Sequence, residues 1–155
     1  MRIGVISDTH GYLDPRAAIA LQGVTRILHA GDIGSAAIVE ALEAIAPVTA
    51  IHGNVDAGTP LARRFPATQR LVLEGVRIYI THIGGRPAKL ASALPAPRPD
   101  VYIFGHSHIA LLETVNGVLF LNPGAAGRPR FGGGLSVALL DVESGQALAQ
   151  IVPLV

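Results

Sequence analysis

The chain has 155 residues, of which 50% are hydrophobic and 15% charged, so a globular fold with a proper core is expected. A net charge of +1 argues against general nucleic-acid binding, and the absence of cysteine excludes disulfides and thiolate metal sites. The N-terminal apolar run is too short for a signal peptide, and no apolar stretch approaches the roughly 20 residues that span a membrane. These features predict a single domain over residues 1–155, without a membrane partner and located in the cytoplasm.

The first third of the chain alternates apolar, β-branched runs with helical patterns. Strands are expected over residues 3–7, 25–30 and 48–52, and helices over residues 16–22 and 35–46. Asp14 followed by Pro15 is typical of a helix start, and Ser35 is the expected cap of the second helix. This order predicts parallel strands joined by right-handed crossovers.

The rest of the chain is dominated by hairpin patterns. Residues 57–67 contain one glycine and two prolines and predict a surface loop. The other elements are expected as a helix over residues 87–94 and strands over residues 68–74, 76–81, 100–104, 111–115, 118–121, 135–142 and 146–152. Asn116-Gly117 is a strong signal for a hairpin turn. Parallel units followed by hairpins predict an α/β sandwich of two packed β-sheets flanked by helices.

Five of the apolar runs end in residues that can bind metal ions. These residues are Asp8 and His10, Asp32, Asn54, His82, and the pair His106 and His108. Because ligands bind at the carboxyl ends of strands in open α/β sheets, all seven side chains are expected to converge at one edge of the sheet core. Seven groups are too many for one ion with an open position, but they suit two ions about 3.5–4 Å apart that share one carboxylate. Mixed imidazole and carboxylate ligands favour Mn, Fe, Zn or Ni.

Glycines accompany each of these strand ends. They lie at positions 11, 31, 53, 84 and 105. Since glycine adopts conformations that other residues avoid, we expect these positions to let the backbone turn sharply where each strand ends.

The order of the metal-binding motifs resembles that of the calcineurin-like metallophosphoesterases. The matching segments are Asp8-x-His10, Gly31-Asp32, Gly53-Asn54, His82 and Gly105-His106-Ser107-His108. Asn122-Pro123-Gly124 after a strand is similar to the small bacterial and archaeal phosphodiesterase branch of that family. The resemblance spans nearly the whole chain, and it implies one metallophosphoesterase domain with an αββα sandwich, a small phosphodiester substrate and a homodimer or higher homo-oligomer.

The resemblance also implies a role for each motif residue. The first ion would be held by Asp8, His10, Asp32 and His108, and the second by Asp32, Asn54, His82 and His106, so that Asp32 bridges them. A hydroxide between the two ions would be the nucleophile, because a bound divalent metal lowers the pKa of water to about 7. The metals and Asn54 would polarise the phosphoryl oxygens. Manganese is the expected metal, with Ni, Zn, Fe or Mg as alternatives.

One position departs from the family pattern. Many members carry a histidine directly after the asparagine of the third motif, where it can protonate the leaving group, but this chain has Val55. Proton transfer of this kind typically contributes a factor of roughly 10²–10⁴, so weak activity on poor leaving groups is expected and the general acid stays unassigned.

Several residues near the motifs keep two interpretations. Arg128 and Arg130 lie in an irregular, Gly/Pro-rich loop, where they either grip phosphate bidentately or are solvated loop charges. Tyr12 either stacks on a substrate ring or packs. Asp8 and Asp32 could alternatively cap helices. For His29 and His52 we favour packing or hydrogen bonding behind the ligands, and for Asp56 the pattern does not decide.

Two classes of function follow. The first is a divalent-metal-dependent phosphoesterase, most consistent with a phosphodiesterase. The second is a non-catalytic protein-interaction scaffold on the same fold, as in the related subunit of the retromer sorting coat. A decayed site would have lost ligands, whereas all seven are present here, so the sequence favours the enzyme.

Overall fold

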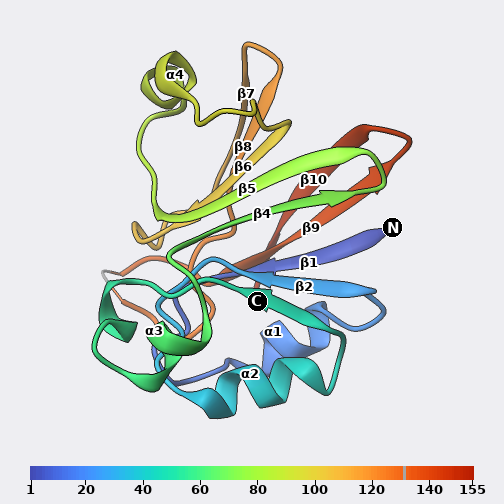
Figure 1. The fold of residues 1–155 in the computed structure, drawn as a ribbon. Helices are drawn as coiled ribbons and strands as arrows, with labels where there is room; N and C mark the ends of the chain where they lie inside the picture. Colours follow the sequence, from blue (N-terminus) through green and yellow to red (C-terminus); the bar gives the residue numbers. More distant parts are fainter. Residues whose placement is uncertain (131) are drawn as a thin grey trace.

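The computed structural model describes residues 1–130 and 132–155, and they form two five-stranded sheets with few helices (Figure 1). Sheet A has the strand order β10-β9-β1-β2-β3, and sheet B has the order β4-β5-β6-β8-β7. The strands of sheet A are β1 (Arg2–Ile6), β2 (Arg26–His29), β3 (Val48–Ala50), β9 (Ser136–Glu143) and β10 (Gln146–Pro153). Those of sheet B are β4 (Thr68–Leu73), β5 (Val76–Ile83), β6 (Val101–Gly105), β7 (Leu111–Val115) and β8 (Val118–Asn122).

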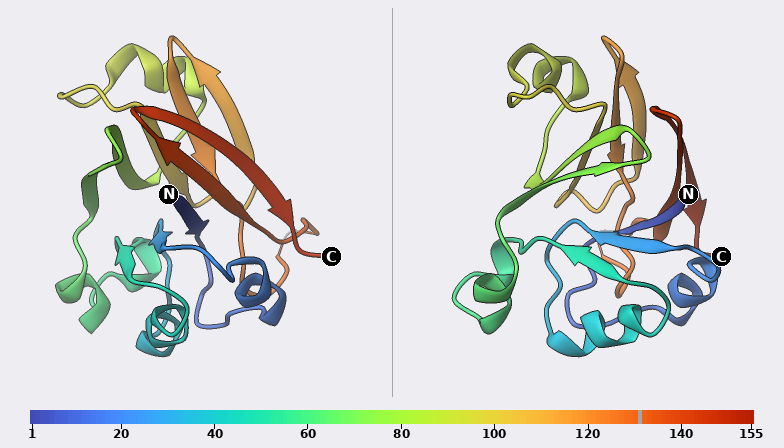
Figure 2. Two further views of the ribbon diagram at one scale, coloured as in Figure 1. Left: turned by 90° about the vertical axis from the view of Figure 1, so that its right-hand side faces the viewer. Right: turned by 45° about the vertical axis from the view of Figure 1, so that its right-hand side comes forward.

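Helices cover sheet A more fully than sheet B. The helices are α1 (Pro15–Ala20), α2 (Ala36–Glu43), α3 (Pro60–Arg64) and α4 (Pro87–Leu90), with short 3-10 turns η1 (Asn54–Asp56) and η2 (Ala91–Ala93). The first three lie on the side of sheet A that faces away from sheet B (Figure 2). On the outer side of sheet B, apolar residues of α4 and η2 pack against an aromatic cluster that includes Tyr102 and Phe104. The predicted sandwich of two sheets with outer helices is therefore confirmed.

Strand alternation explains the layers. Along β6, Val101 and Ile103 enter the core between the sheets, whereas Tyr102 and Phe104 point to the outer face. Strands β1, β2 and β3 pair in parallel, as do β5, β6 and β8, while β9 joins the edge of β1 in antiparallel orientation. Figure 1 shows β1, β2, β5 and β6 running towards the same end of the molecule.

One expectation about local structure was wrong, and one open alternative is excluded. Residues 57–67 are not a plain loop, because α3 begins after Thr59, whose side chain accepts a hydrogen bond from the backbone N–H of Leu61, and Leu61 is buried against sheet A. The helices that follow β1 and β2 begin after Asp14 and Ser35. Asp8 and Asp32 therefore do not cap them and are left for the strand ends.

Among residues 1–130 and 132–155, no helix is both long and apolar enough to cross a membrane.

Candidate metal centre

The carboxyl ends of five strands bring the motif residues to one edge of the molecule. Asp8 and His10 follow β1, Asp32 follows β2, Asn54 opens η1 after β3, His82 lies near the end of β5, and His106 and His108 follow β6. Six of these seven residues form two groups, which we call cluster one (Asp8, His10, His108) and cluster two (Asp32, His82, His106).

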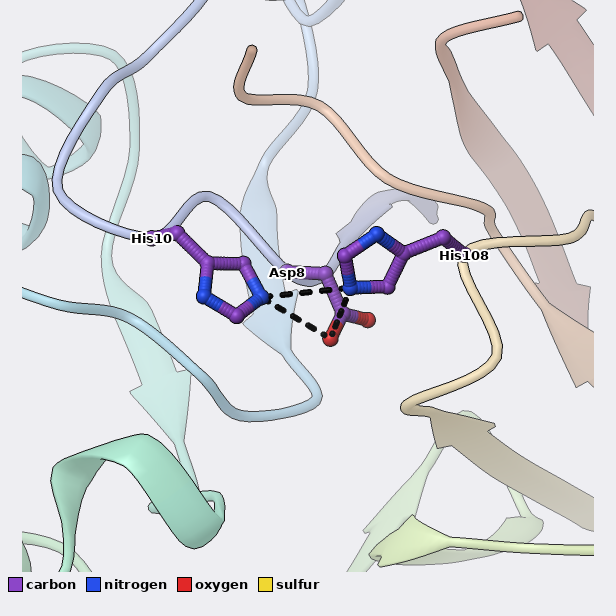
Figure 3. Close-up of side chains that lie close together, drawn as sticks. All are labelled: Asp8, His10 and His108. Carbon is purple, nitrogen blue, oxygen red and sulfur yellow. Dashed lines mark hydrogen bonds and ion pairs between the residues drawn. The ribbon is translucent and has the colours of Figure 1, made fainter. Parts of the chain in front are cut away.

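Cluster one joins the loop after β1 to the turn after β6. The Nε2 atoms of His10 and His108 lie 3.2 Å apart, and Asp8 Oδ1 lies 3.3 Å from His108 Nε2 and 3.7 Å from His10 Nε2 (Figure 3). All three side chains point to one spot, which is the arrangement that a shared cation requires.

Cluster two is built from β5 and the loops after β2 and β6. His82 Nε2 lies 3.1 Å from Asp32 Oδ2, and the rings of His82 and His106 are 5.3 Å apart between centroids. Asp32 Oδ2 also lies 3.5 Å from His10 Nε2 of cluster one. Asp32 is therefore placed between the two clusters, where a bridging carboxylate would have to be.

Asn54 is exposed at the start of η1. The backbone N–H of the next residue, Val55, donates to Asp32 Oδ1 over 3.0 Å, which keeps this turn against cluster two. The side chain of Val55 is also exposed and carries no group that could transfer a proton.

Buried polar atoms in both clusters fit a bound cation. Within the described part of the chain, Asp8 Oδ1 and His82 Nε2 are buried and have no hydrogen-bond partner. His82 Nδ1 lies 2.7 Å from the carbonyl oxygen of Ala30 and donates its proton there, so that the lone pair of Nε2 points into the site. Leaving such groups unpaired costs roughly 1–3 kcal/mol each, a cost that a cation would remove. The residues present therefore fit divalent metal ions held by nitrogen and oxygen.

Backbone strain is concentrated at the same residues. Five candidate ligands have a positive φ, with values of 49° to 73°. They are Asp8, His10, Asp32, His106 and His108. Non-glycine residues in this region are uncommon and each costs of order 1–3 kcal/mol, so the surrounding structure must hold them there.

Three of the five glycines at strand ends serve close packing. None of Gly53, Gly84 and Gly105 has a positive φ. A Cβ at Gly53 would collide with the carboxylate of Asp32, one at Gly84 with the ring of Phe104, and one at Gly105 with the hydroxyl of Ser7. At these three positions glycine is needed not for a left-handed backbone conformation, as we expected, but because the missing side chain leaves room for these neighbours.

A β-bulge places His82. The sequence predicted that the strand ends at residue 81, but β5 continues to Ile83, and its pairing register with β6 shifts between Ile80 and Ile83. Such a bulge re-aims a side chain, and here His82 is buried at the site.

Electrostatics differ between carboxylates and imidazoles. Burial tends to raise the pKa of Asp8, but His10 and the hydroxyl of Ser7 outweigh it and lower the pKa below its ordinary value. Burial also tends to raise the pKa of Asp32. The interactions of its carboxylate with His82 and with the Val55 N–H outweigh this effect, so the pKa of Asp32 is lowered as well. Both carboxylates are thus charged at neutral pH and available to a cation.

The pKa values of His82 and His108 are shifted in opposite directions. Burial is the main cause that lowers the pKa of His108; the carboxylate of Asp8 opposes it, but the shift stays downward, which favours the neutral imidazole that binds metal. Although burial lowers the pKa of His82, the carboxylate of Asp32 and the carbonyl of Ala30 raise it above its ordinary value. A metal ion would compete with the proton at that Nε2.

Asp56 ties together the loops around cluster two. Its buried carboxylate accepts hydrogen bonds from the backbone N–H groups of Ile33, Gly34 and Gly53 over 2.9–3.0 Å. The sequence left its role open, because its three partners lie on two separate loops.

Asn122 supports the turn that carries His106 and His108. It is fully buried, its amide donates to the Gly105 carbonyl and the Ser107 hydroxyl over 3.1 Å, and its Oδ1 accepts from the Gly124 N–H over 2.9 Å. The motif of Asn122-Pro-Gly at the end of a buried strand was noticed in the sequence, but nothing there indicated that it holds a different loop.

His29 lies behind cluster one. Its Nδ1 accepts the Gly31 N–H over 3.1 Å, so Nε2 carries the proton and donates to Thr9 Oγ1 over 3.0 Å; the Thr9 hydroxyl in turn donates to the Ile33 carbonyl. Burial lowers the pKa of His29 to about 4, so the ring is neutral. His52 Nδ1 is 2.8 Å from the carbonyl oxygen of Phe65. Both histidines thus make supporting hydrogen bonds, in agreement with the sequence-based expectation.

The loop after β8 packs on the loop after β1. The Asp14 N–H donates to the Ala126 carbonyl, and the guanidinium of Arg128 lies over the ring of Tyr12, 4.3 Å from its centroid. The Tyr12 ring therefore stacks on an arginine of the chain itself, and Arg128 is held beside the loop that carries Asp8 and His10.

Comparison with known proteins identifies the class. Residues 1–145 match the model of the calcineurin-like phosphoesterase superfamily domain. A probable metallophosphoesterase from Methanothermobacter thermautotrophicus is 33% identical over 98% of this chain and 92% of its own. The chain therefore belongs to the calcineurin-like phosphoesterase superfamily.

Solved structures support this assignment. A structure described as a novel archaeal phosphodiesterase superposes with a TM-score of 0.77 at 26% identity, covering 98% of this chain and 100% of its own. Vps29 from Chaetomium thermophilum superposes with a TM-score of 0.79 at 20% identity, covering 99% and 96%, which shows a shared fold. The prediction of an enzyme of the phosphoesterase class is confirmed by these relatives, and the two clusters form the kind of metal site that the class uses.

Proposed function

We propose that this protein is a two-metal phosphodiesterase acting on small phosphodiesters. The observation that carries the proposal is the position of Asp32, whose Oδ2 lies 3.1 Å from a histidine of cluster two and 3.5 Å from a histidine of cluster one. A carboxylate in that place can serve two ions at once, as two-metal phosphoryl transfer needs.

The proposed ligand sets add Asn54 and a bridging role of Asp32 to the two clusters. Asp8, His10, Asp32 and His108 would hold one ion, and Asp32, Asn54, His82 and His106 the other. Two divalent ions, which we propose to be Mn²⁺, would acidify the attacking water and neutralise charge on the phosphoryl oxygens. Ni, Zn, Fe and Mg are the alternatives to be compared.

The chain's own residues contribute positioning and charge. The exposed amide of Asn54 is available to a phosphoryl oxygen, and its donation would strengthen as negative charge develops there. The guanidinium of Arg128, oriented by Tyr12, offers a second donor group on the side of cluster one. We therefore assign Asn54 and Arg128 to substrate phosphate.

The leaving group receives no proton from the residue after Asn54. Val55 takes the place of the family histidine, and its side chain is apolar. Substrates whose alcohol leaves readily as an anion should be turned over best, because general-acid assistance worth roughly 10²–10⁴-fold is missing at this position.

The same valine motivates the second candidate function, a non-catalytic interaction scaffold. Against it stand Asp8 Oδ1 and His82 Nε2, which are buried without a hydrogen-bond partner, since a scaffold without metal gains nothing from gathering such atoms in its interior. Metal titration separates the two: binding of no Mn²⁺ or Ni²⁺ at micromolar concentration would support the scaffold.

The reaction class is tested with chromogenic esters. Metal-stripped protein receives Mn²⁺, Ni²⁺, Zn²⁺ or Mg²⁺ singly, and hydrolysis of bis-p-nitrophenyl phosphate is compared with that of the monoester. We expect metal-dependent turnover that favours the diester. Absence of turnover with every metal, in protein that unfolds cooperatively, would overturn the proposal.

A further inference from the structure

Exposed branched side chains surround the polar metal centre. Val55, Ile83 and Ile109 each follow a candidate ligand directly in the chain, and their exposed fractions are 46%, 58% and 71%. Single exposed aliphatic residues are ordinary, but three of them that each follow a ligand of one site form a pattern. We call these three residues the apolar rim.

A hollow opens next to this rim. Its volume is 360 Å³, within the range of pockets that hold small ligands. We call it the His106 hollow, because His106 lines it and also belongs to cluster two. Its walls include Phe104, Ile109 and Leu111, and Arg86 is the one charged side chain among the described residues that line it.

The topology explains why the hollow adjoins the metals. Strands β5 and β6 pair in parallel and end side by side, with Ile83 opposite Gly105 (Figure 1). The segments that leave these two strand ends, residues 84–86 and 105–107, both line the hollow. A group attached to a phosphate at cluster two therefore has this space beside it.

A second hollow lies on the other side of Ile109. It has a volume of 280 Å³ and is lined by His108 of cluster one and by Gly133, Gly134 and Leu135, among others. This second hollow is smaller, and the His108 side chain that it adjoins is only 9% exposed. The charge of Arg130 also acts on His108. The His106 hollow, with an aromatic wall and an exposed histidine, is the better place for an apolar group.

We propose that the His106 hollow binds an apolar ester group of the substrate, an aryl or branched alkyl substituent on the phosphate. This inference rests on the proposed phosphodiesterase function and adds its substrate class. A concave space of this volume accommodates a small group, which favours part of a small molecule as the occupant over the face of a partner protein.

The test uses two diesters with the same leaving group. Phenyl p-nitrophenyl phosphate and methyl p-nitrophenyl phosphate both release p-nitrophenolate, so they differ in the ester group that stays on phosphorus. With the Mn²⁺-loaded protein we expect kcat/KM to favour the phenyl ester by about tenfold, the scale on which apolar pockets discriminate.

Two matched variants locate the effect. A Cβ at Gly85 makes only ordinary contacts, the nearest at 3.7 Å to Leu90, so Gly85→Phe can fill the His106 hollow without straining the backbone. Gly134 has open space around its Cβ position, so Gly134→Phe fills the second hollow in the same way. We expect the phenyl preference to fall to near unity in Gly85→Phe and to persist in Gly134→Phe. Ile109→Ser, at an exposed position, should reduce it partly.

A binding measurement accompanies the kinetics. Phenylphosphonate should raise the Tm of the Mn²⁺-loaded protein more than methylphosphonate does, in wild type and Gly134→Phe but not in Gly85→Phe. Equal kcat/KM values of wild type for the two esters would overturn the inference, as would loss of the phenyl preference in Gly134→Phe and not in Gly85→Phe. Either result would leave the phosphodiesterase function intact. Turnover of neither ester would overturn the proposed function itself.

Discussion

The two halves of the metal centre use the same residue types but differ in how closed they are. In cluster one, Asp8 is buried and His10 and His108 are largely covered, and the second oxygen of Asp8 accepts hydrogen bonds from Ser7 and from the His106 N–H. In cluster two, Asp32 and His82 are buried but His106 is exposed, as is neighbouring Asn54. The difference suggests a division of labour in which cluster one fixes an ion and cluster two faces the substrate.

The largest effect is expected from a substitution of Asp32, the residue that the two halves share. Asp32→Asn keeps the shape but lowers the charge between the clusters, so we expect kcat/KM for the diester to fall by at least about a thousandfold. Asp141→Asn, at an exposed ion pair with Arg2 far from the site, is the matched control and should leave activity within about twofold. Similar rates for the two variants would contradict a shared ligand.

The support behind cluster one can be tested by pH. His29 is buried and neutral, with a pKa lowered to about 4 from an ordinary value of 6.5. Its contribution to stability is complete above pH 6.5 and is lost as the pH falls towards 4, by about 3 kcal/mol. The carboxylates of Asp8 and Asp32 have lowered pKa values, so they titrate below this window.

The measurement is the free energy of unfolding of metal-free protein by urea at pH 7 and at pH 4.5. His29→Gln should be less stable than wild type at pH 7, and its stability should decline less than that of wild type between the two pH values; the lowered pKa of His108 leaves a decline of the same sign in both proteins. An unchanged decline in the variant would assign the pH dependence to other groups.

The support behind cluster two lies in Asp56. Asp56→Asn replaces one of the acceptor oxygens that bind three backbone N–H groups, so we expect a loss of about 2 kcal/mol in unfolding free energy. Because those loops carry Asp32 and Asn54, the affinity of one Mn²⁺ should fall while the other stays near its wild-type value. Calorimetric titration resolves the two, and an equal loss at both would refute this local role.

The smallest expected effect is a difference in metal affinity between variants of His106 and His108. His108→Ala removes a largely buried ligand, whereas His106→Ala removes an exposed one. We therefore expect the loss of metal affinity at cluster one in His108→Ala to be on the order of tenfold larger than the loss at cluster two in His106→Ala. The larger loss in His106→Ala would reverse the proposed division between the clusters.

The sequence predicted the β-α-β-α-β succession of the first half with its parallel strands, the hairpins of the second and the strand-end residues of the two clusters, because apolar runs and their terminal residues are local signals. The bulge that re-aims His82 depends on pairing between β5 and β6, and no local pattern encodes that register. Asp56 and Asn122 were out of reach for a similar reason, since each holds a loop that is distant in the chain. Helix α3 could have been predicted, because Thr59-Pro60 followed by an apolar residue is a helix-start signal.

The proposed mechanism needs two ions that act together around Asp32. The most direct measurement titrates Mn²⁺ into metal-stripped protein at a concentration far above the dissociation constants while hydrolysis of bis-p-nitrophenyl phosphate is followed. We expect little turnover up to one equivalent and a rise that levels off at two equivalents per chain. Full activity at one equivalent, or binding of two ions without turnover, would contradict it.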